Sequence, residues 1–244
     1  MAIKGILFDL YGTLIDIETD ESMDEIYRGI AHFLTYQGVY PHRWEVRDRY
    51  YRIMKEQKEA GREEFPEIDV ERIWDAFLAQ EGMSATPERR KLALTLAQIY
   101  RGISRKRLQL YPDVRKVLDT LCPEYRLALV SDAQPGYALP EMKALGLIGY
   151  FDPVVISARY GFRKPDSRLM EMALDTMKLL PAEVIFVGND MYRDIYGAGR
   201  LGIKTIFVES NQGDKQHDKT TPDYVAHRFA DVLDGIAFLA GRPA

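Results

Sequence analysis

Six short runs of β-branched and aromatic residues are spread along the 244-residue chain, and the later ones alternate with stretches of helical periodicity. The helical stretches are about 10–15 residues long, a length typical of the helices that connect parallel strands. This alternation predicts βαβ units and a parallel sheet with helices on both faces. The predicted strands cover residues 3–10, 125–132, 152–158, 183–190, 203–210 and 223–227.

The segment between the first two predicted strands has a different pattern. It is rich in Tyr, Arg and Glu, and its periodicity indicates several amphipathic helices, including residues 23–38 and 70–82. Thr86 precedes a proline and is a candidate helix N-cap. We therefore predict a catalytic core built from residues 1–18 and 107–244, with residues 19–106 inserted as a helical domain.

The composition narrows the classes of partner. Apolar residues make up 46% of the chain and charged residues 29%, with a net charge of −4, so the chain lacks the basic excess typical of nucleic-acid binders. No apolar run approaches the roughly 18 residues that a membrane span needs. A single cysteine and four histidines without ligand spacing give no transition-metal motif. We expect a cytoplasmic protein with a small-molecule partner, and the sequence indicates no oligomeric state.

Polar side chains stand where three of the predicted strands end. Asp9 ends the first strand, Ser131 and Asp132 end the second, and Asn189 and Asp190 end the fourth. Open parallel sheets bind their ligands beyond the carboxyl ends of the strands. An insert that leaves the sheet just after Asp9 would lie over the same edge. The sequence therefore predicts a site between this edge and the inserted helices.

Each residue near the first two strand ends has a structural and a functional interpretation. Asp9 could cap the turn that follows its strand, or act as a nucleophile or metal ligand. Gly12 allows close backbone approach, and the hydroxyl of Thr13 can bind an oxyanion. Ser131 could end its strand with a turn, or donate to a phosphate or carboxylate oxygen.

Two charged positions in the last third of the chain also have alternative interpretations. Lys164 could be a solvated loop residue, but Pro165 fixes the backbone beside it, as suits a cation that binds an anion. Asp190 and Asp194 lie four residues apart on a predicted helix, where like charges repel. A helix N-terminus would offset part of this cost, and a bound Mg²⁺ would offset it better.

Together these residues resemble the haloacid dehalogenase superfamily of hydrolases over nearly the whole chain. "FDLYGT" is similar to the first motif of that family, with Asp9 leading, and "LVSD" is similar to the second, with Ser131. "RKPD" supplies Lys164 for the third motif, and "VGNDMYRD" supplies Asp190 and Asp194 for the fourth. The inserted helices match the C1-type cap. The resemblance implies an α/β fold, with a Rossmann-like parallel sheet and an all-α helical-bundle cap.

The resemblance also implies a mechanism. Asp9 would attack a phosphorus atom and form an aspartyl-phosphate that water then hydrolyses. Mg²⁺ would be bound by Asp9, the main-chain carbonyl of Tyr11 and Asp190, with Asp194 assisting indirectly. The side chains that would hold the phosphoryl oxygens are Thr13, Ser131 and Lys164, and the other residues assigned to the substrate site are Gly12, Asp132 and Asn189.

Tyr11 departs from the pattern of most phosphatases in this superfamily, which carry a second Asp there as the acid and base. L-2-haloacid dehalogenases carry Tyr at this position, but they are metal-independent and lack the leading acid of the fourth motif. They also have Asn where this chain has Asp132. We weigh the acids of the fourth motif more heavily and predict a Mg²⁺-dependent phosphatase for a small phosphorylated metabolite. A dehalogenase-like hydrolase and a low-activity phospho-ligand binding protein are the alternatives.

Overall fold

The structure is a computed structural model that describes residues 2–218 and 220–241. Within these residues a six-stranded parallel sheet has the order β5-β4-β1-β6-β7-β8, which confirms the predicted α/β architecture and its strands. The strands are β1 (Gly5–Phe8), β4 (Arg126–Ser131), β5 (Val154–Ile156), β6 (Val184–Gly188), β7 (Lys204–Val208) and β8 (Tyr224–Ala226).

The register of the central strands brings the predicted site residues to one edge. Phe8 of β1 lies beside Leu129 of β4 on one side and beside Val187 of β6 on the other. The next residues along these strands therefore emerge at the same carboxyl edge. Asp9 and Asn189 directly follow β1 and β6, and Ser131 is the last residue of β4.

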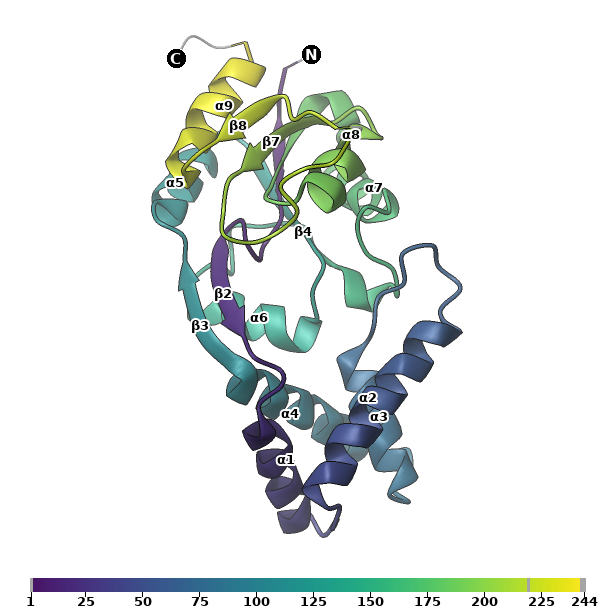
Figure 1. The fold of residues 1–244 in the computed structure, drawn as a ribbon. Coiled ribbons are helices and arrows are strands. Elements are labelled where there is room, and N and C mark those ends of the chain that lie inside the picture. Colours follow the sequence, from purple (N-terminus) through teal and green to yellow (C-terminus); the bar gives the residue numbers. More distant parts are fainter. Residues whose placement is uncertain (1, 219, 242–244) are drawn as a thin grey trace.

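Helices cover both faces of the sheet, because successive side chains of each strand point to opposite faces. Ile6 and Phe8 pack with α5 and α9, whereas Leu7 packs in a separate cluster with α7. Figure 1 shows α5 and α9 on one side of the sheet and α7 and α8 on the other. The helices of this part are α5 (Val114–Leu121), α6 (Pro135–Ala144), α7 (Arg168–Met177), α8 (Gly197–Gly199) and α9 (Val232–Leu239).

An antiparallel strand pair, which the sequence analysis did not predict, connects the sheet to the inserted helices. β2 (Ile15–Thr19) leaves the core and β3 (Arg105–Leu110) returns to it, with Ile15 opposite Leu110. The sequence of β3, "RKRLQL", has only two apolar residues and gives a weak strand signal. Pairing with β2, rather than local preference, therefore determines its conformation.

The inserted segment contains four helices: α1 (Asp24–Tyr36), α2 (Arg43–Ala60), α3 (Val70–Gln80) and α4 (Pro87–Ser104). The hydroxyl of Thr86 accepts the Arg89 N–H at the start of α4, which confirms the predicted N-cap. The buried side chains of these helices form a cluster of their own around Trp74 and Phe77. They lie at the end of the molecule opposite α9 (Figure 1). These features support our proposal that residues 19–106 are a cap on a core of residues 1–18 and 107–244.

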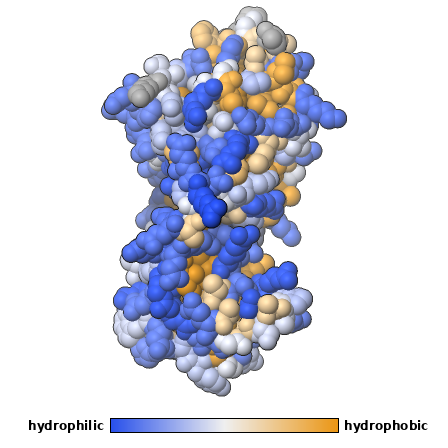
Figure 2. Space-filling view, turned by 90° about the vertical axis from the view of Figure 1, so that its right-hand side faces the viewer, coloured by the Kyte–Doolittle hydropathy of each residue, from blue (hydrophilic) through white to orange (hydrophobic). Residues whose placement is uncertain are grey.

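The outline of the molecular surface is consistent with a core and a separate cap. Figure 2 shows an outline that narrows at mid-height and a face that is hydrophilic over much of its area. Of the helices that the structure describes, none is both long enough and apolar enough to cross a lipid bilayer.

Candidate active site

Asp9 lies at the centre of the carboxyl edge of the sheet. Its main-chain N–H donates to the Val187 carbonyl at 3.0 Å, which continues the pairing of β1 with β6. The side chain is buried, and its two oxygens have different partners. Oδ1 accepts from the Lys164 ammonium at 2.7 Å, and Oδ2 accepts from the Thr13 hydroxyl at 3.1 Å. A carboxylate fixed at both oxygens is well oriented for attack along one direction.

The turn after Asp9 requires glycine. Gly12 has φ of +88°, and a Cβ there would lie 2.4 Å from Nδ2 of Asn189. The fully buried Thr13 also places its hydroxyl 2.9 Å from Oδ1 of Asn189. The first turn after β1 is thus fitted tightly against the first residue after β6.

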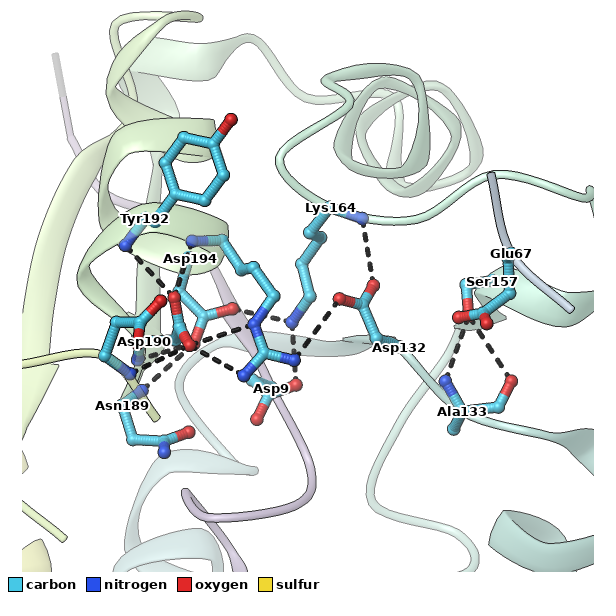
Figure 3. A network of polar contacts seen from close by, with 12 residues as sticks. Asp9, Glu67, Asp132, Ala133, Ser157, Lys164, Asn189, Asp190, Tyr192 and Asp194 are labelled. Carbon is cyan, nitrogen blue, oxygen red and sulfur yellow. Dashed lines mark hydrogen bonds and ion pairs between the residues drawn. The ribbon is translucent and has the colours of Figure 1, made fainter. Parts of the chain in front are cut away.

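Lys164 contacts residues of the first, second and fourth motifs. Its buried ammonium donates to Asp9 at 2.7 Å, to Asp194 at 2.6 Å and to the Val130 carbonyl at 3.2 Å. Figure 3 shows its nitrogen between the two carboxylates. Burial would lower the pKa of Lys164, but Asp194 and Asp9 together raise it above its ordinary value. The side chain is therefore a permanent cation at the site.

Asp190 caps the π-helical turn Met191–Tyr196 and Asp194 lies within it, and each of them accepts from a cation. Asp194 accepts from Lys164 through Oδ1 and from the N–H groups of Asn189 and Asp190 through Oδ2. Asp190 forms an ion pair with Arg193, whose Nε and Nη2 lie 2.9 and 2.7 Å from Oδ2. The two cations offset part of the repulsion expected from the i, i+4 spacing, but burial and the charges of Asp9 and Asp190 still hold the pKa of Asp194 above its ordinary value.

Arg193 is a functional residue that the sequence reasoning missed. Burial raises the pKa of Asp190, but the hydrogen bonds from Arg193 outweigh it and hold this pKa below its ordinary value. The remaining acceptor capacity of Asp190 is taken by main-chain N–H groups of residues 192, 193 and 214. The i, i+3 spacing of Asp190 and Arg193 is a local signal that could have revealed this pair.

A cavity of about 130 Å³ contains these groups. Four aspartates line it against two cations, which leaves a formal excess of two negative charges. No three His, Cys, Asp or Glu side chains of residues 2–218 and 220–241 converge as ligands for one ion. Mg²⁺ commonly uses one or two carboxylates and completes its shell with water and other oxygens. The site thus fits Mg²⁺ in charge and donor type, and Asp190 could bind it once Arg193 released Oδ2. The lining residues are Asp9, Tyr11, Asp132, Lys164, Asn189, Asp190, Arg193, Asp194, Gln212 and Gly213.

The side chain of Tyr11 has a structural partner away from Asp9. Its phenol donates a short hydrogen bond to Glu141 of α6, and Arg101 of α4 binds the same carboxylate at 2.8 and 3.1 Å. Burial, together with the charge of Glu141, raises the pKa of Tyr11 well above its ordinary value. The phenol therefore remains protonated at neutral pH.

The end of β4 presents two polar atoms without hydrogen-bond partners. Among the described residues, no group satisfies the buried hydroxyl of Ser131 or Oδ2 of Asp132. Oδ1 of Asp132 accepts the main-chain N–H of Lys164 at 2.9 Å. Buried polar atoms are nearly always paired in native proteins, so Oδ2 of Asp132, which lines the cavity, is available to a ligand, whereas Ser131 is not among the residues that line it.

A second cavity of about 310 Å³ lies between the sheet edge and the helical cap. Its lining includes Tyr11, Asp132 and Arg193, which also line the smaller cavity. The cap contributes aromatic rings, among them Tyr50 and Tyr100. A ligand could thus place an anionic group at Asp9 and its remaining part beneath the cap.

The chain is similar in sequence to known proteins. The sequence model of a family described as haloacid dehalogenase-like hydrolase matches residues 3–202. A glyceraldehyde 3-phosphate phosphatase of Methanopyrus kandleri is 26% identical over 98% of this chain and 99% of its own. Another, from Methanothermobacter thermautotrophicus, is 32% identical over 54% of this chain and 59% of its own.

Solved structures show the same fold. A 2-haloacid dehalogenase from Pseudomonas syringae pv. Tomato aligns with a TM-score of 0.70 at 22% identity, over 97% of this chain and 99% of that one. A HAD phosphatase from Thermococcus onnurineus aligns with a TM-score of 0.61 at 21% identity, over 99% of this chain and 100% of that one.

Proposed function

The chain belongs to the haloacid dehalogenase-like hydrolases, and from this premise we propose that it is a Mg²⁺-dependent phosphatase for a small phosphorylated metabolite. The observation that carries the proposal is the buried carboxylate of Asp9, held by Lys164 and Thr13 in a cavity lined by four aspartates and two cations. A carboxylate nucleophile beside an ammonium and a hydroxyl that can bind phosphoryl oxygens suits phosphoryl transfer.

In the proposed reaction Asp9 attacks phosphorus, and the phosphoryl group is transferred to its carboxylate. Lys164, Ser131 and Thr13 would bind the nonbridging oxygens as charge redistributes over them. Lys164 also keeps Asp9 oriented through their 2.7 Å contact. Water then hydrolyses the aspartyl-phosphate and restores Asp9.

We propose that the metal site comprises Asp9, the main-chain carbonyl of Tyr11 and Asp190, with Asp194 acting outside the ligand set. The excess of acids in the cavity supports this assignment. When bound, Mg²⁺ would neutralise repulsion between the carboxylate and an anionic substrate.

The relatives named glyceraldehyde 3-phosphate phosphatase support a small phosphorylated substrate. We assign its phosphoryl group to the cavity at Asp9, with Asn189 in the wall and Gly12 packed against Asn189, and its remaining part to the cavity beneath the cap. The proposed setting is the reducing cytoplasm. A single cysteine, Cys122, allows no disulfide within the chain and agrees with this setting.

Dehalogenation of a 2-haloacid is the competing hypothesis, because Tyr11 matches that subgroup. Asp190 disfavours it, because that subgroup lacks the leading acid of the fourth motif.

The test is phosphate release from p-nitrophenyl phosphate with Mg²⁺ and with a chelator, using Asp9→Asn as the control. Release that requires both Mg²⁺ and Asp9 supports the proposal. Absence of release from any phosphate ester, or chelator-insensitive halide release from 2-chloropropionate, would overturn it.

A further inference from the structure

A phosphatase of this kind needs a group that protonates the leaving oxygen and later accepts a proton from water. Tyr11 occupies the position from which this role would be expected, but its phenol is bound to Glu141. Its raised pKa also makes the phenol a poor proton donor near neutral pH. The acid–base step therefore needs another residue.

Asp132 has the position that this step requires. It follows the last residue of β4, and it lines both the cavity that contains Asp9 and the cavity beneath the cap. The leaving oxygen of a bound phosphate ester would lie where these two cavities meet. The Asp132 side chain is only 9% exposed, and within the described part of the chain its Oδ2 has no hydrogen-bond partner.

Oδ1 of Asp132 fixes the orientation of the Asp132 side chain. Oδ1 accepts the main-chain N–H of Lys164 at 2.9 Å, and the ammonium of the same lysine binds Asp9 at 2.7 Å. One residue thus positions both carboxyl groups, as Figure 3 shows. This arrangement leaves Oδ2 without a hydrogen bond, 3.9 Å from Nη1 of Arg193, where it can exchange a proton.

The charges around Asp132 come from four segments. Lys164 and Arg193 favour its ionised form, whereas Asp9 and Glu67 of the cap disfavour it. Burial, which is the largest effect, raises the pKa of Asp132 above its ordinary value, and Lys164 reverses this only in part. A carboxyl group with a raised pKa can alternate between both protonation states closer to neutral pH.

We propose that Asp132 is the acid–base residue of this hydrolase, an inference that rests on the phosphatase function proposed above. Asp9 attacks phosphorus, the bond to the leaving oxygen breaks, and that oxygen takes the proton of Asp132. Water then attacks the aspartyl-phosphate and passes a proton to the Asp132 carboxylate. The bond between phosphorus and Asp9 breaks, which releases phosphate and restores both residues.

Glu67 is the matched comparison for Asp132. It is another cavity-lining carboxyl group whose pKa is raised by burial. However, Oε2 of Glu67 accepts from the Ser157 hydroxyl at 2.8 Å and Oε1 accepts the Ile68 N–H at 2.9 Å. Figure 3 shows it beside Ser157 and apart from the Lys164 cluster. Both oxygens of Glu67 are engaged, so it lacks the free atom that Asp132 offers.

The test compares Asp132→Asn with Glu67→Gln on two substrates, an alkyl phosphate such as glycerol 3-phosphate and p-nitrophenyl phosphate. Nitrophenolate leaves without a proton, whereas an alkoxide needs one. We expect Asp132→Asn to lose roughly 10²–10⁴-fold in kcat/KM on the alkyl phosphate. With p-nitrophenyl phosphate it should show a burst of one nitrophenolate per enzyme followed by slow turnover, because the water step lacks its base. In the wild-type enzyme, kcat/KM for the alkyl phosphate should fall at alkaline pH as Asp132 loses its proton. This fall should be absent in Asp132→Asn. Glu67→Gln should show no burst with p-nitrophenyl phosphate and should keep the dependence of kcat/KM on alkaline pH.

Two results with a folded Asp132→Asn variant would overturn the proposal. One is an equal loss of kcat/KM on both substrates without a burst, and the other is full activity on the alkyl phosphate. If Asp132→Asn does not fold, Asp132→Ala replaces it, and added formate should restore its turnover. A folded Asp132→Ala enzyme that formate does not rescue counts against the proposal. Failure of the wild-type enzyme on every phosphate ester would instead refute the phosphatase function itself.

Discussion

The phenol of Tyr11 donates its hydrogen bond to Glu141, so this side chain is bound to α6 although it lines both cavities. Arg101 of α4 binds the same carboxylate, and its Cζ lies over the Tyr11 ring at 5.3 Å from the ring centroid. Through these three residues, the loop after β1 is connected to the cap. The pair of Arg101 and Glu141 therefore connects the cap to the core, and Tyr11 supports Glu141 from the core side.

Replacing Tyr11 by Phe should affect stability more than catalysis. Glu141 keeps Arg101, so we expect a loss of about 1–2 kcal/mol in the free energy of unfolding. The change in kcat/KM should be less than about tenfold, since one hydrogen bond is worth roughly that factor. Urea denaturation and steady-state kinetics test this. Tyr150→Phe is the control, because it removes a bond to the carboxylate of Asp119 that lies outside both cavities. A loss of several hundredfold in Tyr11→Phe would assign the phenol a direct role.

Replacing Lys164 by Met should strongly destabilise the protein. The substitution leaves the carboxylates of Asp9 and Asp194 buried without their shared cation, which costs about 3–5 kcal/mol. Both carboxylates would then take up protons more readily, so the deficit should shrink as the pH falls. Chemical denaturation at several pH values measures this effect.

Lys106→Met is the control for Lys164→Met, because Lys106 forms an ion pair with Asp20 at 2.7 Å in which the side chains are 49% and 31% exposed. Its effect should be much smaller than that of Lys164→Met, since solvent screens the pair. Equal effects of the two substitutions would contradict the central place given to Lys164.

Replacing Arg193 by Gln should tighten Mg²⁺ binding. The guanidinium holds Oδ2 of Asp190, so its removal frees a proposed ligand and leaves the cavity more negative. A charge-assisted hydrogen bond contributes about 1.5–3 kcal/mol, so we expect roughly tenfold higher affinity. Isothermal titration with MgCl₂ measures it, with Arg200→Gln as an exposed control. Weaker binding in Arg193→Gln would show that Arg193 does not compete with the metal.

Replacing Gln134 by Ala should loosen the closure of the cap. Its side chain donates to the Ile68 carbonyl at 2.8 Å and accepts the Val70 N–H at 3.0 Å, which ties the start of α3 to the core. Two lost bonds to main-chain groups should raise KM by roughly tenfold with a smaller effect on kcat. Limited proteolysis between α2 and α3 should also become faster. Gln80→Ala, which alters an exposed contact with Arg52, should change neither quantity.

The sequence predicted the sheet because its strands are continuous apolar runs, as expected when both faces are buried. The π-helical turn that carries Asp194 was predicted as an ordinary helix, since the two share the same local pattern. The pairing of β2 with β3 was missed because charged residues dominate β3. Its conformation depends on a partner about 90 residues away in sequence, as the pair Asp16 and Gln109 shows.

The sequence also indicated which polar residues share the sheet edge, because parallel strands bring their ends together. It could not show which oxygen of each acid is engaged. The pairing of Asp190 with Arg193, the bond from Tyr11 to Glu141 and the free Oδ2 of Asp132 depend on side-chain geometry. These contacts determine how the motifs would work together.

The central claim is that Asp9 is the phosphorylated nucleophile. The most direct measurement is to quench the enzyme with acid during turnover of a phosphate ester, reduce it with borohydride, and sequence the peptides by mass spectrometry. The account predicts homoserine at position 9, formed from the aspartyl-phosphate, and none in Asp9→Asn. Turnover of the ester with residue 9 unmodified, or with homoserine at another aspartate, would contradict it.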